Sequence, residues 1–127
     1  MIRTVDIYWL AGLLDGEGCF YSNTPFPTPA ISINMTDGDT IEKAYRLMGA
    51  TEKLKTSLTP TGKTKYQFAL RNRRAGSWMM MLYPLLCKRR QQRIREVLTR
   101  WKKARAWSPV GPRSSYAKRL IDKRPKK

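Results

Sequence analysis

Residues Leu10–Gly18, with the sequence LAGLLDGEG, join an apolar helical segment to two acids that are separated by a glycine. Residues 5–16 are apolar over most of a helical surface and predict a buried helix with Thr4 as its N-cap. Asp15 and Glu17 then fall at the C-terminal end of the helix, where the macrodipole disfavours negative charge. Either the two carboxylates are solvated in a surface turn, or a bound cation offsets their charge.

The rest of the chain alternates pairs of strands with helices. Three prolines within residues 24–29 indicate a turn between the first two strands. The expected helices are residues 5–16, 38–48, 75–86 and 88–106, and the expected strands are residues 18–23, 30–35, 52–58 and 63–71. This order predicts a single α+β domain over residues 1–106, with an antiparallel sheet covered by helices on one face. Residues 107–127 predict a basic C-terminal tail.

Alternation along the strands predicts a core face and a polar face of the sheet. The apolar strand residues expected to point inward are Phe20, Ile31, Ile33, Leu54, Leu58, Tyr66, Phe68 and Leu70. The methionines Met79–Met81 are interpreted as core residues of a buried helix. The opposite face of the sheet is either a solvated surface or a surface that lies on nucleic acid.

The chain is strongly basic. Its 127 residues include 26 Lys and Arg against 9 Asp and Glu, a formal net charge of +17, and most of the excess lies after residue 87. This charge predicts a polyanionic partner, because each phosphate that is neutralised releases a condensed counterion. The absence of histidine excludes a histidine base and histidine-ligated zinc, which leaves carboxylates as the ligands for a hard cation.

Cys19 and Cys87 cannot form a disulfide framework, and the chain shows neither a signal peptide nor a membrane-spanning segment. We therefore expect no membrane partner and an intracellular, reducing location. This location is the cytoplasm or nucleoid, or an organelle if an organelle encodes the chain.

The stretch Leu10–Gly18 resembles the signature of the LAGLIDADG homing endonuclease family. Leu14 replaces the usual isoleucine of the signature, and Gly16 and Glu17 replace alanine and aspartate. The order αββαββα over residues 4–106 agrees with the core of that family, whereas the basic tail lies outside the resemblance. The implied fold is a curved four-stranded antiparallel sheet that forms a DNA-binding saddle.

The resemblance implies a homodimer, because the chain carries one signature and a cleavage site needs two. Ala11, Gly12 and Gly16 are expected at the interface between the two signature helices, together with Asp15 as a structural acid. Glu17 is expected to bind a divalent metal, with the Gly16 carbonyl as a further ligand. The implied metal is Mg²⁺, with Mn²⁺ as a substitute, and the implied reaction is a double-strand break in a long, nearly palindromic DNA target.

Further site residues follow from the same resemblance. Asp37 is expected to organise the water around the metal, or else it only caps the helix that starts at Gly38. Lys88 is expected to stabilise charge at the scissile phosphate, with Arg89 as the alternative if the alignment shifts by one position. The outward residues expected to contact DNA are Tyr21, Asn23, Ser32, Asn34, Lys53, Lys55, Ser57, Lys65, Gln67 and Arg71, with Arg89 on the basic helix.

Two other functions stay open. The first is that of an RNA maturase that assists intron splicing. The second is that of a DNA-binding protein that does not cleave. The basic helix and tail favour RNA, whereas Glu17 favours cleavage, because a pure binder has no need of a carboxylate that faces phosphates. For the nuclease we expect a gene that is free-standing or carried by a mobile intron.

Overall fold

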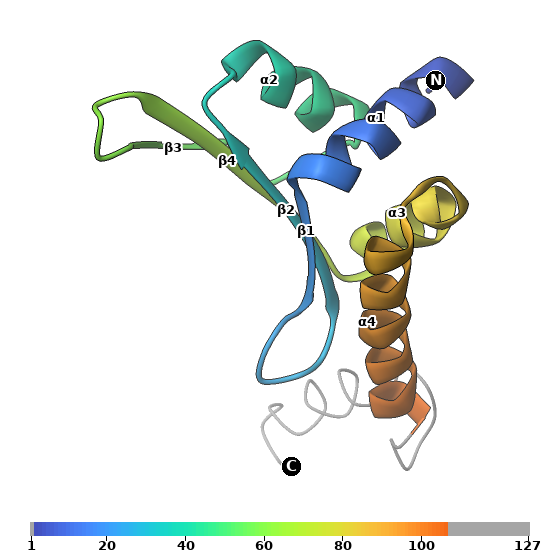
Figure 1. Ribbon diagram of the computed structural model, residues 1–127. Coiled ribbons are helices and arrows are strands. Elements are labelled where there is room, and N and C mark those ends of the chain that lie inside the picture. The colour runs from blue at the N-terminus through green and yellow to red at the C-terminus, as the bar shows by residue number, and fades with distance from the viewer. Residues whose placement is uncertain (1, 107–127) are drawn as a thin grey trace, which may run out of the picture.

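The computed structural model describes residues 2–106 (Figure 1). Its elements are α1 (Thr4–Glu17), β1 (Gly18–Ser22), β2 (Pro29–Met35), α2 (Gly38–Leu47), β3 (Lys55–Leu58), β4 (Thr64–Arg71), α3 (Asn72–Leu82), the 3-10 turn η1 (Tyr83–Leu85) and α4 (Lys88–Ala106). The predicted α+β order is confirmed. The basic tail predicted at residues 107–127 lies outside the described residues.

The four strands form one antiparallel sheet in the order β1-β2-β4-β3. The four helices lie on one side of this sheet, and the sheet bends between its two hairpins (Figure 1). The face without helices lies on the inside of the bend, and it is called the open sheet face below. The prediction of an antiparallel sheet covered on one face is therefore confirmed.

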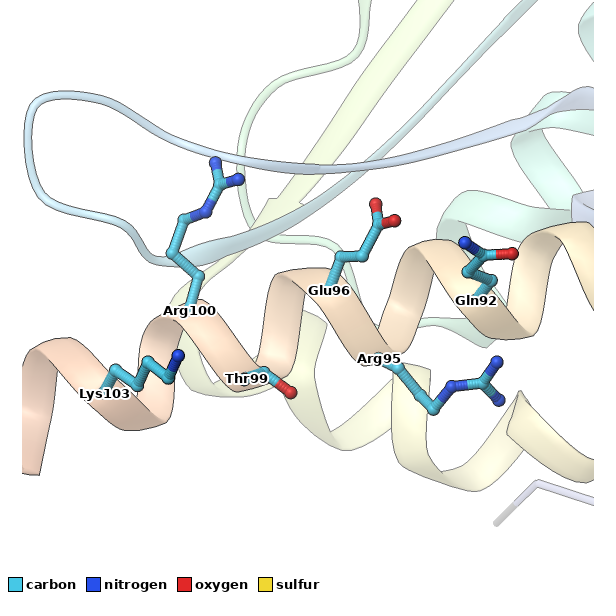
Figure 2. Close-up of a pocket in the computed structure, with 6 residues that line it drawn as sticks. All are labelled: Gln92, Arg95, Glu96, Thr99, Arg100 and Lys103. Atoms are coloured by element: carbon cyan, nitrogen blue, oxygen red, sulfur yellow. The ribbon is translucent and has the colours of Figure 1, made fainter.

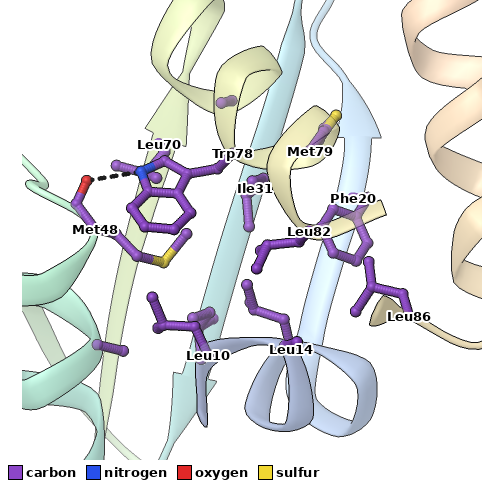
Figure 3. Close-up of a cluster of buried hydrophobic side chains, with 14 of the residues drawn as sticks. Leu10, Leu14, Phe20, Ile31, Met48, Leu70, Trp78, Met79, Leu82 and Leu86 are labelled. Carbon is purple, nitrogen blue, oxygen red and sulfur yellow. Dashed lines mark hydrogen bonds between the residues drawn. The ribbon is translucent and has the colours of Figure 1, made fainter. Parts of the chain in front are cut away.

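The core lies between the sheet and the helices (Figure 3). The inward strand residues Phe20, Ile31, Ile33, Phe68 and Leu70 are at most 3% exposed, as predicted. The helices contribute further buried side chains to the same cluster, which include Leu10, Leu14, Ile41, Trp78, Met79, Leu82, Ile94 and Val97. Burial of each large apolar side chain contributes about 1.5–3 kcal/mol, so this cluster is the main source of stability.

Two predictions about apolar residues are wrong. Leu58 is 73% exposed, because β3 pairs only with β4 and all of its residues are exposed at the sheet edge. Leu54 and Tyr66 pack against the core but are only partly buried. Met80 and Met81 are 61% and 45% exposed, since successive helical residues point about 100° apart and only Met79 faces the core.

Helix α1 was predicted to be a buried helix, but only one of its sides is buried. Its buried residues are Asp6, Leu10, Ala11 and Leu14. Its exposed side, called the α1 face below, comprises Val5, Tyr8, Gly12 and Gly16. Val5 and Tyr8 are 60% and 59% exposed, so residues 2–106 leave a substantial apolar surface of this helix uncovered.

Some element ends also differ from the predictions. The N-cap of α1 is Arg3 rather than Thr4, and the Asp6 carboxylate accepts the Arg3 backbone N–H at 3.3 Å. Helix α3 begins at Asn72, three residues before the predicted start, and gives way to η1 around Pro84. No helix in the described part of the chain has the length and apolar character needed to span a membrane.

Candidate active site and nucleic-acid interface

The α1–β1 junction, residues 15–20, carries the acidic end of the signature. Glu17 is the last residue of α1, and the chain turns there directly into β1. This turn requires glycine at position 18, because a Cβ on Gly18 would lie 2.6 Å from Leu14 Cδ2 and 2.9 Å from the Leu14 carbonyl oxygen. The Glu17 side chain is exposed and makes no hydrogen bond or ion pair with any other residue in 2–106. It is therefore available to an external ligand.

Asp15 has a different environment from Glu17. One of its carboxylate oxygens accepts the backbone N–H of Cys87 at 2.9 Å, directly before α4 begins. This hydrogen bond, with the positive charges of Arg90 and Arg89, lowers the pKa of the Asp15 carboxyl below its ordinary value. An acid at a helix C-terminus is unfavourable, but Asp15 lies at the positive end of α4 and is stabilised there. Asp15 thus links α1 to α4 within one chain.

Lys88 and Arg89 occupy the first turn of α4 and are both exposed. Because Asp15 binds the preceding residue, Cys87, these two cations lie at the end of α4 that meets the α1–β1 junction. The fold therefore brings the basic start of α4 to the acidic end of α1, although the two segments are about 70 residues apart in sequence. Such a placement agrees with a charge-stabilising role for either residue.

Asp37 is the N-cap of α2. Its side chain accepts the Thr40 backbone N–H at 3.2 Å, and this bond lowers the pKa of its carboxyl. Asp37 therefore caps α2, which is the structural role that the sequence suggested for it. Among the other signature residues, Ala11 is 3% exposed and packs in the core of its own chain, which corrects its expected position at a subunit interface.

The open sheet face carries most of the residues predicted to contact DNA. Residues paired across an antiparallel ladder point to the same side, and the pairs Asn34 with Gln67, Lys55 with Gln67 and Ser57 with Lys65 follow this rule. The predicted residues that share this face are Tyr21, Ser32, Asn34, Lys55, Ser57, Lys65, Gln67 and Arg71. The face also includes Cys19, which is exposed and pairs with Ser32.

Three of the predicted contact residues are placed differently from the others. Asn23 and Lys53 lie outside the strands, so the alternation argument does not apply to them. Arg71 is in β4, but it donates to the Glu52 carboxylate at 2.7 Å and to the Asn23 side-chain oxygen at 3.4 Å. The Glu52 carboxylate raises the pKa of Arg71, so this guanidinium is already satisfied within the chain.

Helix α4 presents a second basic surface. Six residues on its exposed side line a shallow depression, and they are Gln92, Arg95, Glu96, Thr99, Arg100 and Lys103 (Figure 2). The opposite side of the helix buries Ile94 and Val97 in the core. Glu96 is the one acid that lines this depression, so the surface suits a polyanion better than a metal ion.

Residues 2–106 of one chain do not provide a complete metal site. Within residues 2–106 there is no group of three or more His, Cys, Asp or Glu side chains that could hold a metal ion. Glu17 and the carbonyl of Gly16 supply two oxygens at a helix C-terminus, where unpaired carbonyls and the macrodipole favour a cation. Because Mg²⁺ prefers six oxygen ligands, the remaining ligands must come from a second chain, from DNA phosphates or from water.

Two arginines at this site were not predicted from the sequence. Arg90 donates to the Asp15 carbonyl at 3.0 Å, and Arg93 donates to the Phe20 carbonyl at 3.0 Å. Both were counted only as part of a basic helix. Their spacing of three residues places them on one side of α4, but no local pattern identifies a partner more than 70 residues away.

No protein family model matches the chain, and no curated protein matches it. The fold is, however, similar to those of several solved structures. The homing endonuclease I-CvuI, in complex with a DNA target, has a TM-score of 0.53 and 16% identity, over 77% of this chain and 67% of its own. The archaeal intron-encoded I-Vdi141I, complexed with DNA, has a TM-score of 0.53 and 14% identity, over 72% of this chain and 65% of its own.

The LAGLIDADG endonuclease I-GzeII, in complex with a DNA target, has a TM-score of 0.51 and 16% identity. That match covers 95% of this chain and 50% of the I-GzeII chain. The signature at Leu10–Gly18 and the architecture therefore agree, and this chain has the fold of the LAGLIDADG homing endonucleases.

Proposed function

We propose that this chain is one subunit of a homodimeric, metal-dependent DNA endonuclease that cuts both strands of a long, nearly palindromic target. The observation that carries the proposal is the α1 face, which ends at the exposed Glu17. The acid predicted to act in catalysis and the surface predicted to pair with a second copy belong to the same helix.

The two glycines of the α1 face support the dimer. A Cβ placed on Gly12 or on Gly16 would meet no atom within 4 Å, so packing inside the chain does not require glycine at either position. A glycine within a helix costs roughly 0.5–1 kcal/mol relative to alanine. Close approach of another backbone is a physical reason to accept this cost. The exposed Val5 and Tyr8 supply apolar surface for the same contact.

A two-fold arrangement of two α1 faces supports the shared active site. Each α1 leads directly into β1, which is an edge strand of its sheet. Packing α1 against α1 therefore brings both Glu17 residues and both β1 edges toward the symmetry axis. Two open sheet faces then form one extended surface, whose symmetry matches a nearly palindromic DNA site.

The proposed roles follow from the chemistry of the side chains. Glu17 and the Gly16 carbonyl of each subunit hold the metal, for which we propose Mg²⁺ with Mn²⁺ as a substitute. A metal held by these oxygens would supply activation of water and stabilisation of charge on the leaving oxygen. Lys88 or Arg89 places a positive charge beside the scissile phosphate. The open sheet face binds the major groove through its polar and basic side chains.

The exposed basic side of α4 supports a second candidate function, which is binding of an intron RNA without cleavage of DNA. Arg95, Arg100 and Lys103 all line the depression on that side of α4, where Arg95 and Arg100 point away from each other (Figure 2). They could contact phosphates of either nucleic acid. The exposed, unpartnered Glu17 is not explained by RNA binding, and we therefore place the nuclease first.

The proposal is tested by incubating the wild-type protein and Glu17→Gln with a library of random DNA duplexes and sequencing the ends. We expect discrete breaks on both strands in Mg²⁺, and a loss of about a thousandfold in rate for Glu17→Gln, because the carboxylate supplies several kcal/mol through the metal. DNA binding in Ca²⁺ should persist in this variant. Glu42→Gln, which neutralises an exposed acid on α2, is the matched control and should cleave normally.

Tight DNA binding without breaks in Mg²⁺ or Mn²⁺ would overturn the nuclease. In that case, binding to an intron RNA in preference to duplex DNA would support the second candidate. Equal losses of cleavage in Glu17→Gln and Glu42→Gln would show that Glu17 has no special role.

A further inference from the structure

Three hydrogen bonds from α4 and from Cys87, the residue before it, hold the chain on both sides of Glu17. The Cys87 N–H donates to the Asp15 carboxylate at 2.9 Å, and Arg90 Nε donates to the Asp15 carbonyl at 3.0 Å. Arg93 Nε donates to the Phe20 carbonyl at 3.0 Å. The acceptors flank Glu17 two residues before and three residues after it. The described helix α4 therefore fixes the α1–β1 junction at both ends.

The donors form a regular row that starts at Cys87, directly before α4, and continues along the first turns of the helix. Positions 87, 90 and 93 are three residues apart, so they follow one side of the helix for nearly two turns. Ile94 and Val97 lie on the same helix beside this row of donors. Both are 1% exposed, and their packing fixes α4 against the core. The row of donors thus has little freedom to move relative to the sheet. Its hydrogen bonds therefore restrict the movement of the α1–β1 junction as well.

The use of arginine at these positions is informative. A guanidinium that binds DNA needs its charge exposed toward phosphates, but Arg90 is partly buried and uses its Nε–H for a backbone carbonyl. Arg93 binds the Phe20 carbonyl through Nε and the Glu96 carboxylate through Nη1 at 3.2 Å. Both side chains therefore have intramolecular partners on or beside the junction. The net charge of the helix does not explain this arrangement.

We infer that Arg90 and Arg93 are positioning residues, which hold the α1–β1 junction so that the Glu17 carboxylate meets the metal in a fixed place. This inference rests on the proposed nuclease function. Neither arginine touches the metal or the scissile phosphate. Each acts through a backbone carbonyl within three residues of Glu17. Geometry of this kind matters because a displacement of about 1 Å at a reacting group can cost roughly a hundredfold in rate.

The test compares Arg90→Gln and Arg93→Gln with Arg46→Gln, which removes the same charge from an exposed position of α2. We expect each junction variant to cleave about tenfold more slowly and to need more Mg²⁺ for half-maximal rate. Duplex affinity without metal should equal that of Arg46→Gln. Hydrogen–deuterium exchange at residues 15–20 should rise in the two junction variants and stay unchanged in the control.

Two further variants separate positioning from general stability. Arg90→Lys, which can still donate to a carbonyl, should recover part of the rate and of the exchange protection. Glu96→Gln removes the ion pair of Arg93 but leaves its bond to Phe20, and it should behave as wild type. Thermal unfolding of every variant shows whether the changed Mg²⁺ requirement follows a loss of stability.

Several outcomes would overturn the inference. Equal Mg²⁺ requirement and equal exchange in the junction variants and in Arg46→Gln would remove the positioning role. A loss of duplex affinity without a change in exchange would make Arg90 and Arg93 DNA contacts instead. Failure of the wild-type protein to cleave any duplex would remove the nuclease itself, and with it the positioning role. That result is distinct from cleavage that the arginine variants do not alter.

Discussion

The α1 face and the open side of the β3–β4 hairpin (residues 55–71) are both left uncovered by the described chain, but they differ in chemistry. The α1 face is apolar and contains two glycines that internal packing does not require. Strand β3 of the hairpin is exposed along its whole length, and Lys55 pairs across the ladder with Gln67 of β4. The two regions are therefore suited to different partners.

The difference shows how one small domain can present two kinds of interface. An exposed apolar helix that lacks side chains at two positions suits close contact with another protein backbone. An exposed, basic and polar sheet edge suits phosphates and base edges. The helix is held from within by α4 through the α1–β1 junction, whereas β3 is held only by its pairing with β4.

The largest expected effect is on the α1 face. Gly12→Leu should weaken self-association about a hundredfold, because overpacking of a close contact costs roughly 1–3 kcal/mol. The single chain should not be destabilised, since no atom lies within 4 Å of a Cβ at this position. Sedimentation equilibrium measures the association, and thermal unfolding at low concentration measures the stability.

The matched control for this variant is Thr99→Leu, which adds the same side chain to an exposed position of α4. If Gly12→Leu and Thr99→Leu associate equally well, the α1 face is not a subunit interface. The α1 face and the β3–β4 hairpin would then not differ in the kind of partner that they bind.

An intermediate effect is expected in the β3–β4 hairpin. Replacement of both Lys55 and Lys65 by alanine should weaken duplex binding about tenfold and reduce the dependence of log affinity on log salt by about two. Stability should stay unchanged because β3 is exposed throughout. Fluorescence anisotropy over a range of salt concentrations measures both quantities. An equal effect from replacing Lys102 and Lys103 of α4 would show that total charge, not the open sheet face, determines affinity.

The smallest expected effect is on stability at the α1–β1 junction. Asp15→Asn should lose about 1 kcal/mol at neutral pH, a typical value for loss of a charged cap at a helix N-terminus. The folded-state pKa of Asp15 is lowered, so its stabilisation is present above the unfolded value of about 3.9 and is lost as the pH falls through the folded value. The difference between wild type and variant should therefore shrink below about pH 5.

Thermal unfolding between neutral pH and about pH 3 checks this prediction. Asp6 and Asp37 also have lowered pKa values, but both residues are present in both proteins and their contributions cancel. A difference that does not change with pH would show that the Asp15 charge is unimportant. In that case the junction would depend only on neutral hydrogen bonds.

Strand alternation was enough to predict the inward residues of β2 and of the buried part of β4. Ile31, Ile33, Phe68 and Leu70 have neighbours in the helix layer, so their pattern reflects real burial. Leu58 has the same pattern but lies on an edge strand without such a neighbour. A sequence pattern states which residues share a face, but it does not state how far the adjoining layer extends.

The signature predicted the end of α1 and the exposed Glu17, because those features depend on local turn chemistry at Gly18. It did not predict which side of α1 faces the core, because the helix is apolar over most of its surface and no side is clearly the more apolar one. Ala11 was therefore assigned to a subunit interface although it is buried. The roles of Arg90 and Arg93 depend on contacts with residues more than 70 positions away in the sequence, and no local sequence pattern predicts such contacts.

The bonds that hold Glu17 also set the moment in synthesis at which the junction can form. They join residues 72, 75 and 73 positions apart, and the last donor is Arg93. Because a chain is made from its N-terminus, the signature helix leaves the ribosome long before the arginines that secure it. A translation product that stops before residue 93 therefore lacks a complete junction. Under the proposed function, a prematurely terminated chain would hold Glu17 poorly and cleave DNA slowly.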